Sequence, residues 1–319
     1  MRGPRRMMRG RRRGAAVGDR VLFGVCAVAA LVTIVVIVEI AYQVASGASP
    51  AISRFGLGFI GGPDWRPNFG VFGAATFLFG TAVTSFLAVL LATPIGIAIG
   101  LYLTMLAPRA VRTVVGPLVE MLAAVPSVIL GFWGILVLGP FLIRHVEPWL
   151  HSWLGFIPLF GPPETTGTGL FAAVVVLTIM VVPIVASISR DLFLTVPREL
   201  QDGAAALGAT RWETVRGVIL PITSSGVAAA AFLGLGRALG EAIAVTQVIG
   251  GGSVIHASLF QTGDTLASRI AEQFQSAETS LHKASLFYLA LIILVIGLAT
   301  NLLAQAISRR FGPDRILAV

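Results

Sequence analysis

The stretch VLFGVCAVAALVTIVVIV, residues 21–38, contains no charged residue and is long enough to cross a lipid bilayer as a helix. It follows a basic tail with eight arginines: Arg2, Arg5, Arg6, Arg9, Arg11, Arg12, Arg13 and Arg20. A secretory signal peptide also joins a basic start to an apolar core, but that core has only about 7 to 15 residues. We therefore interpret residues 21–46 as an uncleaved first membrane span.

The rest of the chain has the same apolar character. Of its 319 residues, 56% are hydrophobic and only 12% are charged, whereas an ordinary soluble domain has roughly 25% charged residues. Further apolar runs lie at about 71–106, 113–143, 169–189, 219–250 and 284–308. The sequence therefore predicts an all-α membrane protein with six transmembrane helices and no soluble domain of useful size.

The basic residues predict the orientation of these helices. The formal net charge is +8, but the basic residues cluster beside apolar runs, so we expect them to face membrane lipid rather than nucleic acid. Six spans with a cytoplasmic N-terminus place 17 basic residues inside and five outside. A further crossing at Pro94, within the long second run, would place eleven on each side and remove this bias. We therefore predict six spans, both termini in the cytoplasm and a kinked helix at Pro94.

This topology divides the chain into successive segments. We expect a cytoplasmic tail at 1–20, the first span at 21–46, an external loop at 47–71, a transmembrane domain at 72–308 and a cytoplasmic tail at 309–319. Within the transmembrane domain, residues 190–218 form the longest cytoplasmic connection, and residues 144–168 and 251–283 form external loops. In the last loop, apolar residues at fourfold spacing (Leu266, Ile270 and Phe274) predict an amphipathic helix that either rests on the membrane interface or docks an external partner.

Two charged residues lie inside the fifth apolar run. Arg237 is eighteen residues beyond the start of the run, near mid-membrane, and Glu241 follows one helical turn later on the same face. An arginine at this depth costs at least about 2.5 kcal/mol on insertion scales, so it usually lines a cavity or a pathway. A guanidinium suits an oxyanion, because it is permanently charged and offers a planar fork of donors. Glu241 would neutralise Arg237 in the empty site and give way to an arriving anion; an internally neutralised pair that only packs helices is the alternative.

The third run supplies a further candidate for the pathway. In LAAVPSVILGFWG, residues 122–134, Pro126 frees a backbone carbonyl and the hydroxyl of Ser127 can form hydrogen bonds. Free backbone groups at membrane depth are tolerated only beside protein or water. The candidate pathway residues are therefore Arg237, Glu241 and Ser127. Glu120, in contrast, is interpreted as a helix-packing acceptor near the inner surface.

The cytoplasmic connection has the pattern of two short helices. The first begins near Pro197 and ends at Gly208, and the second begins with a capping box at Thr210 and Glu213 and ends before Pro221. Such a hairpin is either a plain connection or a rigid protrusion that a cytoplasmic motor could bind. The only lysine is Lys283, which is external, so this chain has no GxxxxGK[ST] phosphate-binding loop. An ATPase would have to be a separate subunit.

This loop resembles the EAA motif of ABC importer permeases. That motif has Glu-Ala-Ala, three residues, a glycine, nine residues and Ile-x-Leu-Pro; this chain has DGAAALG at 202–208 and VILP at 218–221. Asp202 replaces the usual glutamate, and Gly203 replaces an alanine, which weakens the helix by up to about 1 kcal/mol. The resemblance implies that the loop is a coupling helix bound by the ATPase, through the residues that match the motif: Asp202, Gly203, Ala204, Gly208, Leu220 and Pro221.

Two further segments, 122–134 and 234–251 (GLGRALGEAIAVTQVIGG), resemble the permeases of the phosphate-specific Pst system, PstC more than PstA. The resemblance covers about residues 72–308. It implies a MetI-like transmembrane domain in a bacterial inner membrane and inorganic phosphate as substrate, with Arg237 and Glu241 matching the family's translocation residues. It also implies a second, PstA-like permease, two PstB-like ATPase subunits and an external PstS-like phosphate-binding protein. Such a permease is not itself an enzyme, and we expect no metal or cofactor.

Other functions remain open on the sequence alone. An arginine does not distinguish phosphate from sulfate or molybdate, so a permease for another oxyanion fits the same residues. A proton-coupled secondary anion transporter could also use a membrane Arg and Glu, but it would need no EAA-like spacing. A scaffold or sensor would form a complex without transporting anything.

Overall fold

The chain folds into long helices that run side by side. A computed structural model describes the backbone of residues 5–310 and the side chains of residues 19–307. Residues 5–20 of the predicted N-terminal tail are helical, whereas most of the predicted tail at 309–319 lies outside the described residues. Six helices in this part of the chain are long and apolar enough to cross a membrane: Asp19–Phe55, Ala75–Leu106, Ser127–Leu154, Leu170–Thr195, Arg211–Gly240 and Ser280–Ile307. The predicted six-span, all-α fold is confirmed.

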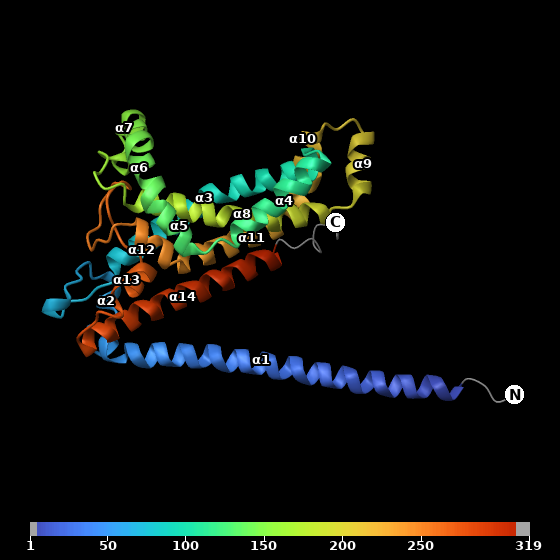
Figure 1. Ribbon diagram of the computed structural model, residues 1–319, viewed down its shortest axis with the longest axis horizontal. Coiled ribbons are helices and arrows are strands. Elements are labelled where there is room, and N and C mark those ends of the chain that lie inside the picture. The colour runs from blue at the N-terminus through green and yellow to red at the C-terminus, as the bar shows by residue number, and fades with distance from the viewer. Residues whose placement is uncertain (1–4, 311–319) are drawn as a thin grey trace.

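The core of the bundle is formed by α3 (Ala75–Leu101), α8 (Leu170–Thr195), α11 (Leu220–Gly240) and α14 (Ser280–Arg310) (Figure 1). Small residues let α3 and α8 approach closely. A Cβ atom at Gly96 would lie only 2.8 Å from the Cβ of Val185, and Ala88 and Ala92 of α3 are fully buried in the same core. Close approach through small residues is typical of helix packing in membranes, where dispersion replaces the hydrophobic drive.

The first helix, α1 (Arg5–Phe55), packs only through its C-terminal part. There Gly47 lies against the ring of Phe287 on α14, and the Tyr288 hydroxyl donates a hydrogen bond to the carbonyl of Gly56 at 3.1 Å. Toward its N-terminus, α1 diverges from α14 (Figure 1), and the side chains of residues 19–40 are all exposed. The helix also extends beyond residue 47, where we predicted an external loop; the loop region instead holds the end of α1, the short helix α2 (Gly58–Gly61) and the 3₁₀ turn η1 (Pro67–Phe69).

The second run is a single helix, as the charge bias predicts. Pro94 lies inside α3, which continues to Leu101 and then widens into the π-helical segment η2 (Tyr102–Leu106). The chain turns at Ala107 and Pro108 and enters α4 (Arg109–Ala123). No crossing is added at Pro94, so the count of six spans holds.

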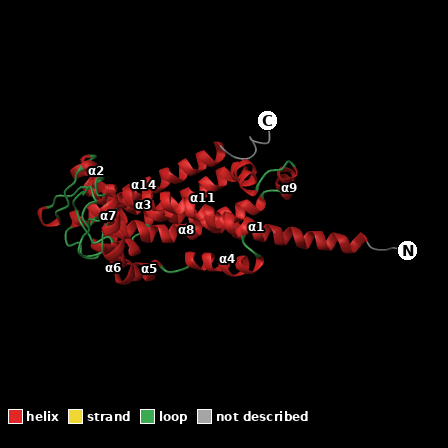
Figure 2. Ribbon diagram, turned by 90° about the horizontal axis from the view of Figure 1, so that it is seen from above, coloured by secondary structure: helices red, strands yellow, loops and turns green. Residues whose placement is uncertain are grey.

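The remaining short helices lie at opposite ends of the bundle (Figures 1 and 2). The helices α9 (Arg198–Ala206) and α10 (Arg211–Thr214) lie at the same end as the start of α1 and the end of α14. The helices α2, α7 (Glu147–Leu154) and α13 (Leu266–Gln273) lie at the other end. We call these the α9 end and the α13 end. Segments predicted to share a side of the membrane therefore lie together.

Candidate functional site

Two of the six crossings are broken near the middle of the bundle. In the third, α4 ends at Ala123 and α5 (Ser127–Trp133) begins four residues later; Figure 2 shows the two helices separated by a short loop. In the fifth, α11 ends at Gly240 and α12 (Ile243–Val248) follows. The third apolar run, at about 113–143, is therefore interrupted within its length. Pro126 breaks it, because a proline has no N–H and forces the residue before it out of the helical region.

Beyond its break, the third crossing continues through the π-helical segments η3 (Gly134–Leu138) and η4 (Leu142–Val146), with α6 (Gly139–Phe141) between them, and ends in α7. The 3₁₀ turn η5 (Pro158–Phe160) follows on the way to α8.

Arg237 and Glu241 meet at the break in the fifth crossing. Arg237 is in the last turn of α11, and Glu241 is the first residue after that helix, with an extended backbone (ψ 116°). Arg237 Nη2 lies 3.3 Å from Glu241 Oε2; the arginine side chain is 47% exposed and the glutamate side chain 5%. A cation at the C-terminus of a helix interacts favourably with the helix dipole. The charge of Arg237 is thus held by one long ion pair and stays half open to its surroundings.

Glu241 also contacts the helix that follows the break. Its Oε1 accepts a hydrogen bond from the backbone N–H of Ala244, in the first turn of α12, at 3.2 Å. An acid at a helix N-terminus pairs with N–H groups that have no partner within the helix. One carboxylate therefore joins the guanidinium at the end of α11 to the start of α12.

In the third crossing, Ser127 and Glu120 lie on opposite sides of the break. Ser127 is the first residue of α5 and is partly buried. Its helix packs against α12, so the half-helices that follow the two breaks contact each other. Glu120 lies before the break, on α4, where its Oε1 is 2.8 Å from Nη2 of Arg190 on α8. The predicted helix-packing role of Glu120 is confirmed.

The predicted hairpin between the fourth and fifth spans is present at the α9 end. Pro197 is the residue before α9, and Gly208 makes the turn with a left-handed backbone (φ +85°). The capping box is complete, since Glu213 N–H donates to Thr210 Oγ1 at 3.3 Å and Thr210 N–H donates to Glu213 Oε2 at 2.7 Å. The second helix does not end before Pro221, however: α10 continues through the π-helical segment η6 (Val215–Ile219) into α11. Pro221 lies where the π-helical segment gives way to α11, so the helix passes through the proline without ending.

The motif residues of the hairpin occupy two elements. Asp202, Gly203 and Ala204 lie on α9, whereas Leu220 and Pro221 open α11. Sequence reasoning missed Leu207 at the tip of the hairpin, whose side chain is 91% exposed. An exposed leucine beside a helix-terminating glycine is the signal that could have found it, since a large apolar side chain at a protruding tip indicates a contact surface.

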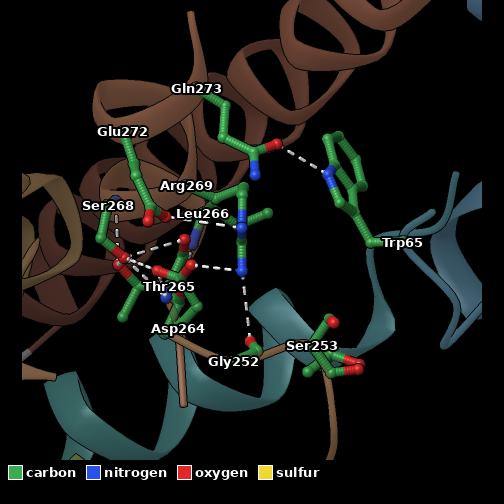
Figure 3. Close-up of polar contacts among 12 residues, drawn as sticks. Trp65, Gly252, Ser253, Asp264, Thr265, Leu266, Ser268, Arg269, Glu272 and Gln273 are labelled. Atoms are coloured by element: carbon green, nitrogen blue, oxygen red, sulfur yellow. Dashed lines mark hydrogen bonds and ion pairs between the residues drawn. The ribbon is translucent and has the colours of Figure 1, made fainter. Parts of the chain in front are cut away.

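A second cluster of charges, at the α13 end, was not predicted (Figure 3). Arg269 Nη2 lies 2.7 Å from Asp264 Oδ2, and the two side chains are only 8% and 1% exposed. Arg269 also reaches Glu272 Oε2 through Nη1, and it donates to the carbonyl of Gly252, each at 3.4 Å. Its guanidinium lies over the ring of Phe77, 4.9 Å from the centroid. We call Asp264, Arg269 and these contacts the outer cluster.

Hydroxyl groups complete the outer cluster. The hydroxyl of Ser268 and the backbone N–H of Thr265 both donate to Asp264 Oδ1. Thr81 on α3 accepts a hydrogen bond from Leu266 N–H at 2.9 Å, which fixes the start of α13 to α3. The predicted amphipathic helix therefore exists, but its first half is buried in the end of the bundle, with Arg269 on the inner face. The helical pattern alone had placed that arginine on the polar face.

Burial dominates the ionisation of the outer cluster. Burial raises the pKa of the Asp264 carboxyl from its ordinary 3.8 to about 6, against the opposing effects of the nearby Arg269 charge and the Ser268 hydrogen bond. Asp264 follows α12 in the loop outside the membrane-spanning helices. This carboxyl therefore titrates in the mildly acidic range.

Comparisons with known proteins agree on one family. Residues 92–313 match the family model described as "Binding-protein-dependent transport system inner membrane component". A phosphate transport system permease protein PstC of Mesorhizobium japonicum is 41% identical over 286 residues, covering 88% of this chain and 87% of the relative. A PstC of Pasteurella multocida is 43% identical over 255 residues, covering 78% and 79%.

A solved structure has the same fold. The crystal structure of a bacterial alginate ABC transporter, in complex with a periplasmic protein bound to an alginate pentasaccharide, contains a chain that matches with a TM-score of 0.61. The match covers 93% of this chain and 96% of that chain at 16% sequence identity, so it supports the arrangement of the helices alone.

Proposed function

This chain belongs to the phosphate transport system permeases, within the binding-protein-dependent inner membrane components, and we propose that it forms half of the pathway through which an ATP-driven importer moves phosphate. It is a multi-pass protein of a bacterial inner membrane and a transport subunit rather than an enzyme. The observation that carries the proposed pathway is Arg237, a half-exposed cation at a break in a membrane-spanning helix.

The geometry of Arg237 suits a transient anion site. Its one carboxylate partner holds it at 3.3 Å, longer than the 2.7–2.9 Å of a strong charge-assisted hydrogen bond. A phosphate oxygen can therefore replace Glu241 at the guanidinium, while Glu241 keeps its hydrogen bond to Ala244 at the start of α12. In other transporters, broken helices at mid-membrane form substrate sites, because they expose backbone polar groups at a depth where the lipid offers no hydrogen-bonding partner.

The hairpin of α9 and α10 supports a mechanical link to an ATPase. We infer that the α9 end faces the cytoplasm, in keeping with the 17 basic residues that this topology places inside. The exposed Leu207 and the residues Asp202 to Gly208 would then enter a cleft of the ATPase. A continuous helix from Arg211 to Gly240 leads from this hairpin to Arg237, so a push at the hairpin moves the break directly.

The proposed cycle is alternating access. An external binding protein delivers phosphate at the α13 end, and ATP-driven closure of two ATPase subunits moves the hairpin, so that the spans rock about the site at Arg237. The partners would be a PstA-like permease, two PstB-like ATPases and a PstS-like binding protein. Arg237 supplies the counter-charge, Glu241 neutralises it between transport events, and Ser127 at the start of α5 adds a hydroxyl.

Reconstitution tests the proposed function. The chain, purified with the four partner subunits in proteoliposomes, is expected to take up labelled phosphate only with ATP and the binding protein, and excess sulfate or molybdate should not compete. Uptake driven by a proton gradient without the ATPase would instead establish a secondary transporter. Uptake of sulfate or molybdate would establish another oxyanion permease, and an assembled complex without flux would establish a scaffold.

A pair of glycine substitutions tests the coupling role of the hairpin. Gly208→Val should leave ATP hydrolysis but remove phosphate uptake, because a β-branched residue resists the left-handed backbone at φ +85°. Gly203→Ala is the matched control: a Cβ there meets nothing within 4 Å, so it should strengthen α9 and keep uptake. Uptake that survives Gly208→Val would remove the turn from the mechanism.

A further inference from the structure

Gln247, on α12, carries a buried polar atom with no partner. Its side-chain oxygen Oε1 is shielded from solvent and has no hydrogen bond within the described part of the chain. Buried polar atoms of native proteins are nearly always paired, and an exception often marks a functional site. An apolar side chain of the same length would fill the space without this penalty. The amide therefore calls for an explanation beyond packing.

The unpaired oxygen lies in the seam where α12 packs against the third crossing. A Cβ atom at Gly131 of α5 would come within 2.7 Å of Gln247 Oε1 and 3.1 Å of Ala244 Cα. One turn later, a Cβ at Gly134 would come within 2.6 Å of Val248 Cγ1. The two half-helices thus approach as closely as glycine permits, and the amide oxygen lies against Gly131 at this contact.

The two sides of the seam are anchored differently. The C-terminal end of α12 is held by Gly169 N–H, which donates to Val248 O at 2.9 Å, and by Gly263 N–H, which donates to Ile249 O at 3.2 Å. The helix α5, in contrast, begins at the break before Pro126, where the chain leaves helical geometry. Movement at the seam is therefore expected on the α5 side, with Gln247 kept in place.

Gln247 lies close along the chain to the proposed anion site. It follows Glu241 by six residues, which corresponds to about 9 Å along the axis of a helix. We propose, building on the proposed function, that Gln247 is a further residue of the translocation route. When α5 moves away from α12, the side-chain amide of Gln247 forms hydrogen bonds with the passing phosphate. The seam is then a closed section of the route between Arg237 and the α13 end.

The chemistry of an amide fits a protonated oxyanion. The side chain offers two N–H donors and one carbonyl acceptor. Hydrogen phosphate presents oxygens that accept the donors and a hydroxyl that donates to Oε1, whereas sulfate presents oxygens only. A neutral amide also binds an anion less tightly than a second arginine would, which lets the anion leave.

Cysteine accessibility tests this inference. Cys26 is the only cysteine of the chain, so Cys26→Ser gives a thiol-free background in which Gln247→Cys can be labelled. In the reconstituted complex with ATP and binding protein, an anionic methanethiosulfonate reagent should modify Gln247→Cys, and saturating phosphate should slow the modification. Val245→Cys is the control on the same helix, because Val245 is buried in the core and should stay unmodified. A Gln247→Cys thiol that stays unmodified during turnover would overturn the inference.

Transport by Gln247→Met gives a second, independent readout. Methionine matches the length of glutamine but cannot hydrogen-bond phosphate, so maximal phosphate uptake should fall about tenfold, the effect of losing one such bond. Assembly and ATPase activity should be retained. Wild-type uptake in Gln247→Met would refute the inference while leaving the proposed function intact. Only a wild-type complex that fails to take up phosphate would count against the proposed function itself.

Discussion

The chain holds two arginine–carboxylate pairs in opposite ways. At the break of the fifth crossing, Arg237 is half exposed and meets Glu241 at 3.3 Å. In the outer cluster, Arg269 is nearly fully buried and meets Asp264 at 2.7 Å, with a carbonyl, a second carboxylate and an aromatic ring around it. The residue types are the same, but the number of partners differs.

This difference separates a guanidinium that can bind an arriving anion from one whose charge is already fully paired. A half-exposed guanidinium with one long contact can exchange its partner for an anion more easily, because solvent already screens part of its charge. A guanidinium sealed among several partners cannot, because removing any partner leaves a buried charge unpaired. We therefore propose a transport role for Arg237 and a structural role at the α13 end for Arg269.

The largest expected effect is on transport at Arg237. Arg237→Ala should reduce phosphate uptake to background while the complex still assembles, with a lower unfolding temperature because the buried Glu241, 5% exposed, loses its counter-charge. Arg66→Ala is the matched control: Arg66 also forms an exposed pair, with Asp64 at 2.9 Å, but outside the spans, and uptake should persist. Labelled-phosphate uptake and thermal unfolding measure both variants. Normal uptake in Arg237→Ala would refute the assigned role.

The opposite outcome is expected at Arg269. Arg269→Ala should lower the free energy of unfolding by about 3–5 kcal/mol, because it leaves the buried Asp264 without its counter-charge. Thermal unfolding of the purified complex and the amount of membrane-inserted protein would both fall. The double variant Arg269→Met with Asp264→Leu should recover most of the loss, since apolar residues can replace a buried pair. If Arg269→Ala alone is as stable as wild type, the contrast between the pairs fails.

The pKa of Asp264 predicts a pH dependence of the outer cluster. Because the pKa is raised to about 6 in the folded chain from an ordinary 3.8, the folded state binds the proton more tightly than the unfolded state. This contribution to stability is present below about pH 4 and is lost as the pH rises through 6, up to roughly 3 kcal/mol at about 1.4 kcal/mol per pKa unit. Unfolding temperatures measured from pH 4 to 7 should show this loss in wild type and not in Asp264→Asn. Identical profiles would contradict the assignment.

The smallest effect is expected at the exposed partner of Arg269. Glu272→Gln should change the free energy of unfolding by about 0–1 kcal/mol, because the Glu272 side chain is 46% exposed and its ion pair is screened by water. The measurement is the same thermal unfolding assay. A loss as large as that of Arg269→Ala would mean that the outer cluster is a network in which no partner is dispensable.

Sequence reasoning succeeded for features that depend on the residues of a single segment. The apolar runs predicted six spans, and the capping box at Thr210 and Glu213 formed with both of its hydrogen bonds. Pro126 marked a break in the third crossing, although the run was predicted as one span. The break after Gly240 carried no proline, so the extended backbone of Glu241 was not foreseen.

Sequence reasoning failed where several segments meet. Arg269 had the spacing of an exposed residue on an amphipathic helix, and its burial depends on Phe77 of α3 and Gly252 of a distant loop. Nor did the sequence indicate that the side-chain oxygen of Gln247 would be buried against Gly131 of α5.

The sequence by itself determined that the protein crosses a membrane six times, with a cation and an acid on one face of the fifth span. Hydrophobic length and helical period are properties of a single segment, so they need no knowledge of neighbours. Only the tertiary structure decided which arginine stays open and which is sealed. Burial and pairing are properties of several segments together, and the packing of α3, α5, α12 and α13 is fixed only when the whole bundle forms.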